Sequence, residues 1–177
     1  MNNIIWLNGV SSAGKTSISK ILQNKLEDTY LHIQVDDFQN MFPTKHYMWT
    51  NEFWDIAIPM FSAFHHSIKA YYDNGVNLIV DHVLVNDEWK KECEKIFSNS
   101  RVIFIGVKCS LEVLQERVNK RDNRPDWIAE YQFNKVHNGL VYDFEIDTTT
   151  MTAEECSSII LEKIKTLKNP HGIKYIV

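Results

Sequence analysis

Cysteine is scarce in this 177-residue chain, and its three copies follow no recognisable spacing. Cys93, Cys109 and Cys156 are an odd number, and no two of them form a C-x-x-C pair. A disulfide framework needs an even set of cysteines, and structural zinc sites usually use closely spaced pairs. The sequence therefore indicates neither, and we expect reduced thiols in a cytoplasmic protein.

The sequence also lacks a basic excess and a long apolar run. Lys and Arg number 19 against 23 Asp and Glu, so the net charge is −4 and no bulk positive field attracts a nucleic-acid backbone. No basic segment precedes the first apolar residues, and no apolar run approaches the about 20 residues that span a membrane. We therefore expect neither a nucleic acid nor a membrane as partner.

Internal repeats, low-complexity tracts and linkers are absent as well, so residues 1–177 are expected to form one domain. Near-continuous apolar segments alternate with amphipathic ones, which predicts an α/β fold with a parallel sheet covered on both faces. Strands are expected at residues 4–9, 30–35, 76–80, 101–107 and 142–146. Helices are expected at residues 17–26, 52–73, 87–97, 110–120, 126–137 and 152–167.

Residues 9–16 have the spacing G-x-x-x-x-G-K-[ST] of a phosphate-binding loop. Glycines at both ends permit backbone conformations that a side chain forbids, so the loop curls its N–H groups around phosphate oxygens. Lys15 is placed to reach the β- and γ-phosphates, and Thr16 to coordinate Mg²⁺. A strand-like run before the motif and a helical pattern after it supply the required context. The residues expected to bind the nucleotide are Gly9, Ser11, Ser12, Ala13, Gly14, Lys15, Thr16 and Ser17.

Three acidic residues lie where predicted strands end, and ligands of parallel sheets gather at these ends. Asp36 and Asp37 are candidates for the general base of phosphoryl transfer to a hydroxyl. Strand alternation sends their carboxylates to opposite sides, so only one should face the acceptor, and the pattern alone does not say which. Asp81 resembles a Walker-B acid that holds Mg²⁺ through water, although a strand-terminal turn residue is the alternative.

Histidine and arginine side chains add further candidates. His82 is a possible substrate contact, against the commoner reading of a structural histidine. Arg117, Arg121 and Arg124 are spaced by four and three residues, which keeps neighbours on one helix face. Beside a phosphate loop this spacing predicts a lid whose guanidinium groups neutralise the transferring phosphate. A solvated basic face is the alternative.

Residues 38–54 are unusually rich in aromatic side chains. Because aromatic faces suit a flat or apolar ligand, this stretch is the candidate acceptor pocket, and packing beneath a long loop is the alternative. The residues expected to contact the acceptor are Asp37, Phe38, Phe42, Trp49, Trp54 and His82.

Taken together, these residues make the chain similar to the chloramphenicol phosphotransferase family of P-loop kinases. The segments that carry the resemblance are LNGVSSAGKT at 7–16 and YDFEIDT at 142–148, with residues 35–36, 78–81, 106–109, 121–124 and 136–137. The resemblance implies a three-layer sandwich around a five-stranded parallel sheet, an arginine-bearing lid, ATP with Mg²⁺, and a small-molecule hydroxyl acceptor, in chloramphenicol the primary hydroxyl.

The resemblance also implies roles for single residues. It makes Asp36 the base, with Asp37 its neighbour, and Arg121 and Arg124 the lid arginines that act with Lys15. Arg117 is expected to contact the nucleotide. The sequence departs from the family where the acceptor should bind, because residues 38–60 are richer in aromatics and His82 stands where an acid is expected.

Two other functions remain open at this point. One is a kinase of a metabolite, nucleoside or sugar that shares the phosphate loop. The other is a non-catalytic nucleotide-binding switch. A GTP switch is expected to carry an N-K-x-D-type guanine-reading motif, and this sequence has none.

Overall fold

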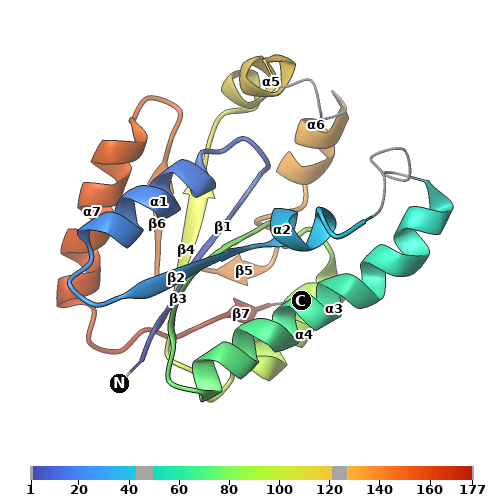
Figure 1. The fold of residues 1–177 in the computed structure, drawn as a ribbon. Helices are drawn as coiled ribbons and strands as arrows, with labels where there is room; N and C mark the ends of the chain where they lie inside the picture. Colours follow the sequence, from blue (N-terminus) through green and yellow to red (C-terminus); the bar gives the residue numbers. More distant parts are fainter. Residues whose placement is uncertain (1, 43–49, 121–126, 177) are drawn as a thin grey trace.

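Five parallel strands form the central sheet (Figure 1). The computed structural model describes residues 2–42, 50–120 and 127–176. The strands lie in the order β2-β3-β1-β4-β6. Their bounds are Ile4–Gly9 for β1, Tyr30–Gln34 for β2, Asn77–His82 for β3, Val102–Lys108 for β4 and Phe144–Asp147 for β6. This sheet confirms the expected α/β architecture.

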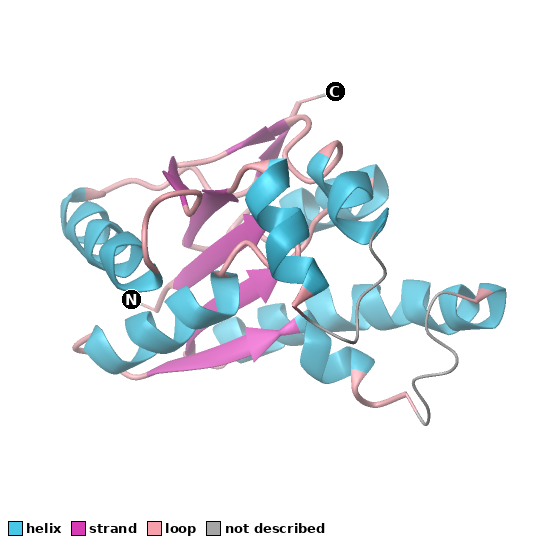
Figure 2. Ribbon diagram, turned by 90° about the horizontal axis from the view of Figure 1, so that it is seen from above, coloured by secondary structure: helices cyan, strands magenta, loops and turns pink. Residues whose placement is uncertain are grey.

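Helices cover both faces of the sheet (Figure 2). Helices α1 (Lys15–Lys25) and α7 (Ala153–Thr166) pack against each other on one face. The other face carries α3 (Asn51–Asp73) and α4 (Asp87–Ile96). Strand alternation explains the two layers, since Ile5 and Leu7 join the core under α1 while Ile4 and Trp6 join the core under α3. None of the helices in the described part of the chain is both long and apolar enough to cross a bilayer.

Several helix ends follow expected capping rules. Ser110 accepts a hydrogen bond from the Val113 N–H at the start of α5 (Leu111–Asn119). Thr152 and Glu155 form a complete capping box at the start of α7. Gly75, with φ +84°, follows the C-cap of α3 in the left-handed conformation that glycine tolerates best.

The segment after β2 differs from the expectation. Strand β2 ends at Gln34, and Val35–Gln39 form the short helix α2. The expectation that Asp36 and Asp37 end a strand is therefore wrong, and strand alternation does not describe the directions of their carboxylates. Both acids lie in the first turn of α2, where the partial positive charge of the helix N-terminus favours carboxylates.

The segment near the C-terminus also departs from the expected elements. Helix α6 runs from Trp127 to Phe133, and the chain then forms turns up to Gly139, whose φ is +69°. The helix is thus shorter than the expected 126–137. Strand β5 (Leu140–Val141) pairs antiparallel with β7 (Lys174–Tyr175), a two-stranded sheet that the sequence did not predict.

Candidate active site

The phosphate loop connects β1 to α1. Gly14 has φ +90° and precedes the first residue of α1, so its expected conformational role is met. Gly9 has a different reason, because a Cβ there would lie 2.4 Å from the carbonyl oxygen of Val107 on β4. Glycine is required at position 9 because β1 and β4 approach each other closely there. The φ angle of Gly9 is not positive, so the expected curl of the loop does not depend on this residue.

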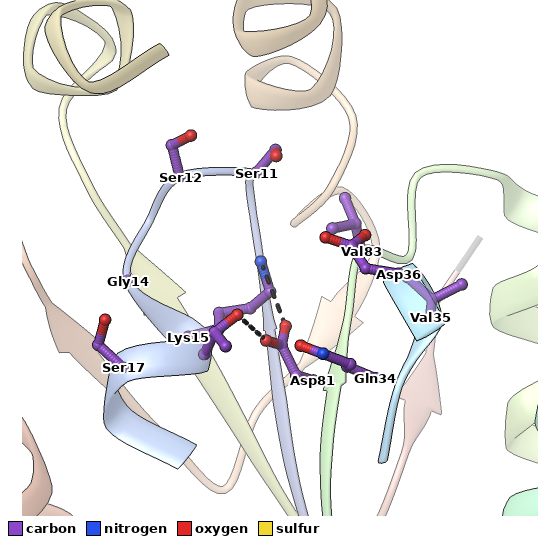
Figure 3. Close-up of a pocket in the computed structure, with 11 residues that line it drawn as sticks. Ser11, Ser12, Gly14, Lys15, Ser17, Gln34, Val35, Asp36, Asp81 and Val83 are labelled. Atoms are coloured by element: carbon purple, nitrogen blue, oxygen red, sulfur yellow. Dashed lines mark hydrogen bonds and ion pairs between the residues drawn. The ribbon is translucent and has the colours of Figure 1, made fainter. Parts of the chain in front are cut away.

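Lys15 lies against Asp81 of β3 beside this loop (Figure 3). Thr16 also contacts Asp81. The Lys15 Nζ atom lies 3.6 Å from Asp81 Oδ1 and donates a hydrogen bond of 3.0 Å to the Val10 carbonyl. The Thr16 hydroxyl donates to Asp81 Oδ2 at 2.5 Å. Lys15 and Asp81 are both buried. A buried cation at the N-terminus of a helix, where the partial positive charge of the helix adds to it, is suited to bind a phosphate.

The oxygen atoms at this position fit a magnesium ion. Mg²⁺ usually takes one or two protein oxygens and completes its coordination with phosphates and water. The Thr16 hydroxyl and the Asp81 carboxylate are such ligands, and they already contact each other. Among the described residues, no group of three or more His, Cys, Asp and Glu could hold a metal by itself. The two oxygens from Thr16 and Asp81 match the number that Mg²⁺ usually takes from a protein.

Two cavities meet at Asp36. The first, the phosphate cleft, is lined by the loop from Ser11 to Ser17 and, on the α2 side, by Asp36 (Figure 3). The second, the aromatic pocket, lies beyond α2 and also includes Asp36 in its wall. Asp37 is exposed, accepts a hydrogen bond from Gln34 Nε2 at 2.9 Å and lines neither cavity. The structure thus distinguishes the two acids, because Asp36 lines both cavities and Asp37 lines neither. The sequence pattern alone did not distinguish them.

The aromatic pocket has a volume of about 290 Å³. Its rings come from three helices, α3, α4 and α6: Trp54, Phe61, Trp89, Trp127 and Tyr131. The Phe61 and Trp89 rings pack closely, with centroids 4.1 Å apart and planes tilted by 35°. No Lys, Arg or His stands among its described lining residues. Such a pocket suits an uncharged molecule with a flat or apolar body.

Most of the expected acceptor contacts lie elsewhere. Trp54 lines the aromatic pocket, whereas Trp49 lies outside the described residues. Phe38 packs edge-on against Phe64, and Phe42 packs against Phe53, each with ring centroids 5.0 Å apart. Both rings pack against the core under α3, which is the alternative that the sequence had left open.

His82 lies in the core behind the aromatic pocket. Its side chain is completely buried, and Nε2 lies 3.0 Å from Nε2 of His65. His65 in turn places Nδ1 2.6 Å from Glu92 Oε2. Burial, followed by the charges of His65 and Lys15, holds the pKa of His82 well below its ordinary value. His82 is therefore a neutral core histidine, and the expected contact with the acceptor has no support in its position.

A further cleft of about 400 Å³ adjoins the phosphate loop on the α1 side, and Arg117 lines it. The Arg117 guanidinium donates to the carbonyl oxygens of Thr148 at 2.8 Å and Ser12 at 3.4 Å. These bonds connect the phosphate loop with the segment after β6. Arg121 and Arg124, the expected lid arginines, lie outside the described residues.

Sequence reasoning missed most of the aromatic pocket. Trp127 and Tyr131 are four residues apart on a predicted helix, so their shared face was a usable signal. Trp89 looks like an ordinary core residue of an amphipathic helix, and nothing in the sequence separates it from one. Gln132 carries no motif, yet its Oε1 accepts a hydrogen bond from the Ser11 N–H at 2.8 Å.

Comparisons with known proteins agree with this geometry. The family model described as "CPT: Chloramphenicol phosphotransferase-like protein" matches residues 2–165. "Putative O-phosphotransferase Rv2636" of Mycobacterium tuberculosis is 30% identical over 190 residues, which cover 94% of this chain and 84% of that protein.

Solved kinase structures share the fold. A sugar kinase from Janibacter sp. superposes with a TM-score of 0.70 at 18% identity, covering 93% of this chain and 95% of that one. Shikimate kinase from Acinetobacter baumannii, in complex with shikimate, superposes with a TM-score of 0.68 at 14% identity, covering 95% and 96%. The expected P-loop kinase fold is thus confirmed. The chain belongs to the chloramphenicol phosphotransferase-like family and is a phosphotransferase.

Proposed function

We propose that this chain is an ATP- and Mg²⁺-dependent kinase that transfers the γ-phosphoryl group to a hydroxyl of a small, uncharged molecule with an aromatic or apolar body. An antibiotic of the amphenicol type is the acceptor class that we put forward. One observation carries the proposal: Asp36 lines both the phosphate cleft and the aromatic pocket. A hydroxyl held in the pocket and a phosphate held in the cleft would meet at this carboxylate.

The chemistry assigns a separate task to each group. The acceptor oxygen forms a bond to the γ-phosphorus as the bond to the β–γ bridging oxygen breaks, and ADP leaves. Asp36 takes the hydroxyl proton and later returns it to water. Lys15, already buried beside the loop, neutralises charge that develops on the phosphate oxygens.

Thr16 and Asp81 would hold the magnesium ion, since their oxygens are the hard ligands that Mg²⁺ prefers. When bound, the ion neutralises phosphate charge. The nucleotide base would occupy the cleft lined by Arg117 because this cleft adjoins Ser12 and Gly14 of the loop. We keep Arg121 and Arg124 as the proposed lid arginines on the strength of the family resemblance.

The lining of the aromatic pocket supports the acceptor class. A phosphorylated or carboxylated acceptor would need a cation, and no described residue of the pocket wall supplies one. Trp127 is 52% exposed, so part of the ring wall is open to an incoming ligand. Aromatic walls with a few polar groups recognise small ligands through buried area and set orientation through hydrogen bonds.

The test is a panel of amphenicols, other antibiotics, nucleosides and sugars, each incubated with ATP and Mg²⁺ and examined by mass spectrometry. We expect a gain of one phosphoryl group on an amphenicol. If only a sugar or a nucleoside gained a phosphoryl group, the enzyme would be a metabolite kinase and not an antibiotic kinase. Tight ATP binding without product from any hydroxyl compound would favour a nucleotide-binding switch.

A further inference from the structure

Gln132 lines one cavity and is hydrogen-bonded to a residue that lines the other. It lies on α6 and lines the aromatic pocket, with only 7% of its surface exposed. Its Oε1 accepts the hydrogen bond from the backbone N–H of Ser11, at 2.8 Å, and Ser11 lines the phosphate cleft. This buried side chain therefore connects the wall of the acceptor cavity directly with the phosphate loop.

The backbone that follows Gln132 is held in place from two directions. Val136 donates its N–H to the Gln132 carbonyl at 2.8 Å, and its own carbonyl accepts from Asn8 Nδ2 of β1 at 3.1 Å. Lys90 of α4, 1% exposed, donates to the carbonyls of Lys135 at 3.0 Å and Asn138 at 2.9 Å. These hydrogen bonds hold the backbone at and after Gln132 in place and so restrict the position of its side-chain amide. The exposed rings of α6 lie in its first turns.

The hydrogen bond to Ser11 fixes which way this amide is turned. A backbone N–H can only donate, so the atom facing the loop must be the carbonyl oxygen and not the amino group. Because the oxygen is committed to Ser11, the amino group is the part of the amide left for the aromatic pocket. No other described residue is seen to accept a hydrogen bond from it. The pocket therefore offers two N–H donors at a defined place in an otherwise ring-lined wall.

We propose that Gln132 is a positioning residue that couples the two cavities: its oxygen holds the Ser11 amide while its amino group donates to a second oxygen atom of the acceptor. This inference rests on the proposed kinase function and adds a requirement to it. The acceptor must carry, besides the reacting hydroxyl, an oxygen able to accept a hydrogen bond. The proposal also means that a ligand bound in one cavity changes the affinity of the other cavity through a single side chain, Gln132.

The first measurement uses the unliganded protein. Hydrogen exchange of the Ser11 amide is followed by NMR in wild type, Gln132→Met, Gln132→Glu and Gln39→Met. Gln39 is the matched control, because it lines the same pocket and makes no observed bond to the loop. We expect at least about tenfold faster exchange in Gln132→Met and wild-type exchange in the other two, since a carboxylate still accepts from Ser11. Unchanged exchange in Gln132→Met would overturn the link.

The second measurement is calorimetric binding of a non-hydrolysable ATP analogue with Mg²⁺, with and without saturating chloramphenicol. We expect chloramphenicol to change the Kd of the analogue by about fivefold or more in wild type. This coupling factor should fall to about one in Gln132→Met. Chloramphenicol alone should bind at least about tenfold more weakly to Gln132→Glu, which keeps the Ser11 contact but has lost the donors.

The outcomes distinguish failure of the proposed role of Gln132 from failure of the proposed acceptor class. Wild-type protein that binds the ATP analogue but not chloramphenicol would overturn the proposed acceptor class. Chloramphenicol binding that remains fully coupled in Gln132→Met, or equally tight in Gln132→Glu, would overturn the role of Gln132 and leave the kinase proposal standing.

Discussion

The phosphate cleft and the aromatic pocket share Asp36 but are built in opposite ways. One wall of the cleft comes from a single segment, residues 11–17, completed by Asp81 of β3. The rings of the pocket come from α3, α4 and α6, which are distant in sequence. A contiguous motif produces the same local geometry in many proteins, whereas a pocket assembled from several helices depends on how each chain packs.

The two cavities also differ in the physics of binding. The cleft holds a buried lysine, an aspartate and a helix N-terminus, so charge dominates there. The pocket has rings and two glutamines, with Asp36 at its edge, so buried area and shape dominate. Changes in the cleft should therefore affect the rate, and changes in the pocket should affect which acceptor is bound.

The largest effect is expected for Lys15→Ala. Removal of this buried charge should lower kcat by at least about a thousandfold, because the transferring phosphoryl group develops charge that Lys15 neutralises. Turnover is measured at saturating ATP and acceptor. Lys20→Ala, an exposed change on the same helix, is the matched control and should keep wild-type turnover. Wild-type turnover in a folded Lys15→Ala variant would refute the role of the loop.

Asp36→Asn should have the next largest effect. The amide keeps the size and still forms hydrogen bonds but cannot take the proton, so kcat should fall by about two to four orders of magnitude with little change in nucleotide affinity. Asp37→Asn is the control, because Asp37 is exposed and lines neither cavity. If Asp37→Asn were inactive and Asp36→Asn active, Asp37 would be the general base instead of Asp36. If both variants were active, the general base would be another residue, and Asp81 would be tested next.

Prediction from sequence succeeded where local chemistry decides the structure. The phosphate loop, the sheet and the helix caps follow from short-range patterns, and the structure brings Lys15, Thr16 and Asp81 together as expected. The functional roles of these residues stay predictions. The choice of Asp36 over Asp37 needed the family resemblance, because strand alternation was the wrong geometry for a segment that is helical.

Prediction from sequence failed where packing between distant segments determines the position of a side chain. Phe38 and Phe42 have the same residue type as pocket rings but turn into the core under α3, and only the packed helices determine that difference. His82 follows Asp81 on β3, and alternation sends it to the opposite face of the sheet, among buried rings. This opposition was readable from the sequence, since adjacent strand residues cannot both face the phosphate cleft.

A smaller effect is expected in the aromatic pocket. Trp127→Ala removes an exposed ring from its wall and should raise the KM of the acceptor by about tenfold, with the KM of ATP and the melting temperature nearly unchanged. Phe42→Ala is the contrasting variant, and it should lower thermal stability without changing either KM. Steady-state kinetics and thermal melts of both variants make the test. An acceptor KM that responds to Phe42 and not to Trp127 would place the acceptor elsewhere.

The smallest effect concerns His82, on the core side of the pocket. Its pKa is lowered by burial, so the unfolded chain binds a proton below its ordinary pKa while the folded chain does not. Stability from this residue is therefore complete above about pH 6.5 and is lost as the pH falls below that value. Between pH 7.5 and 6.0 the free energy of unfolding should drop by roughly 1 kcal/mol on account of His82 alone.

Urea unfolding at the two pH values measures this drop, and it should shrink by about that amount in His82→Asn. His66→Gln, a change at an exposed neighbour, should keep the whole wild-type fall. Because a buried Asn costs stability at every pH, the pH-dependent difference is the informative quantity. NMR of the wild-type His82 ring gives an independent check, since its signals should not titrate between pH 7.5 and 6.0. A midpoint near the ordinary histidine value would mean that water reaches His82, and the wall behind Phe61 and Trp89 would then be open.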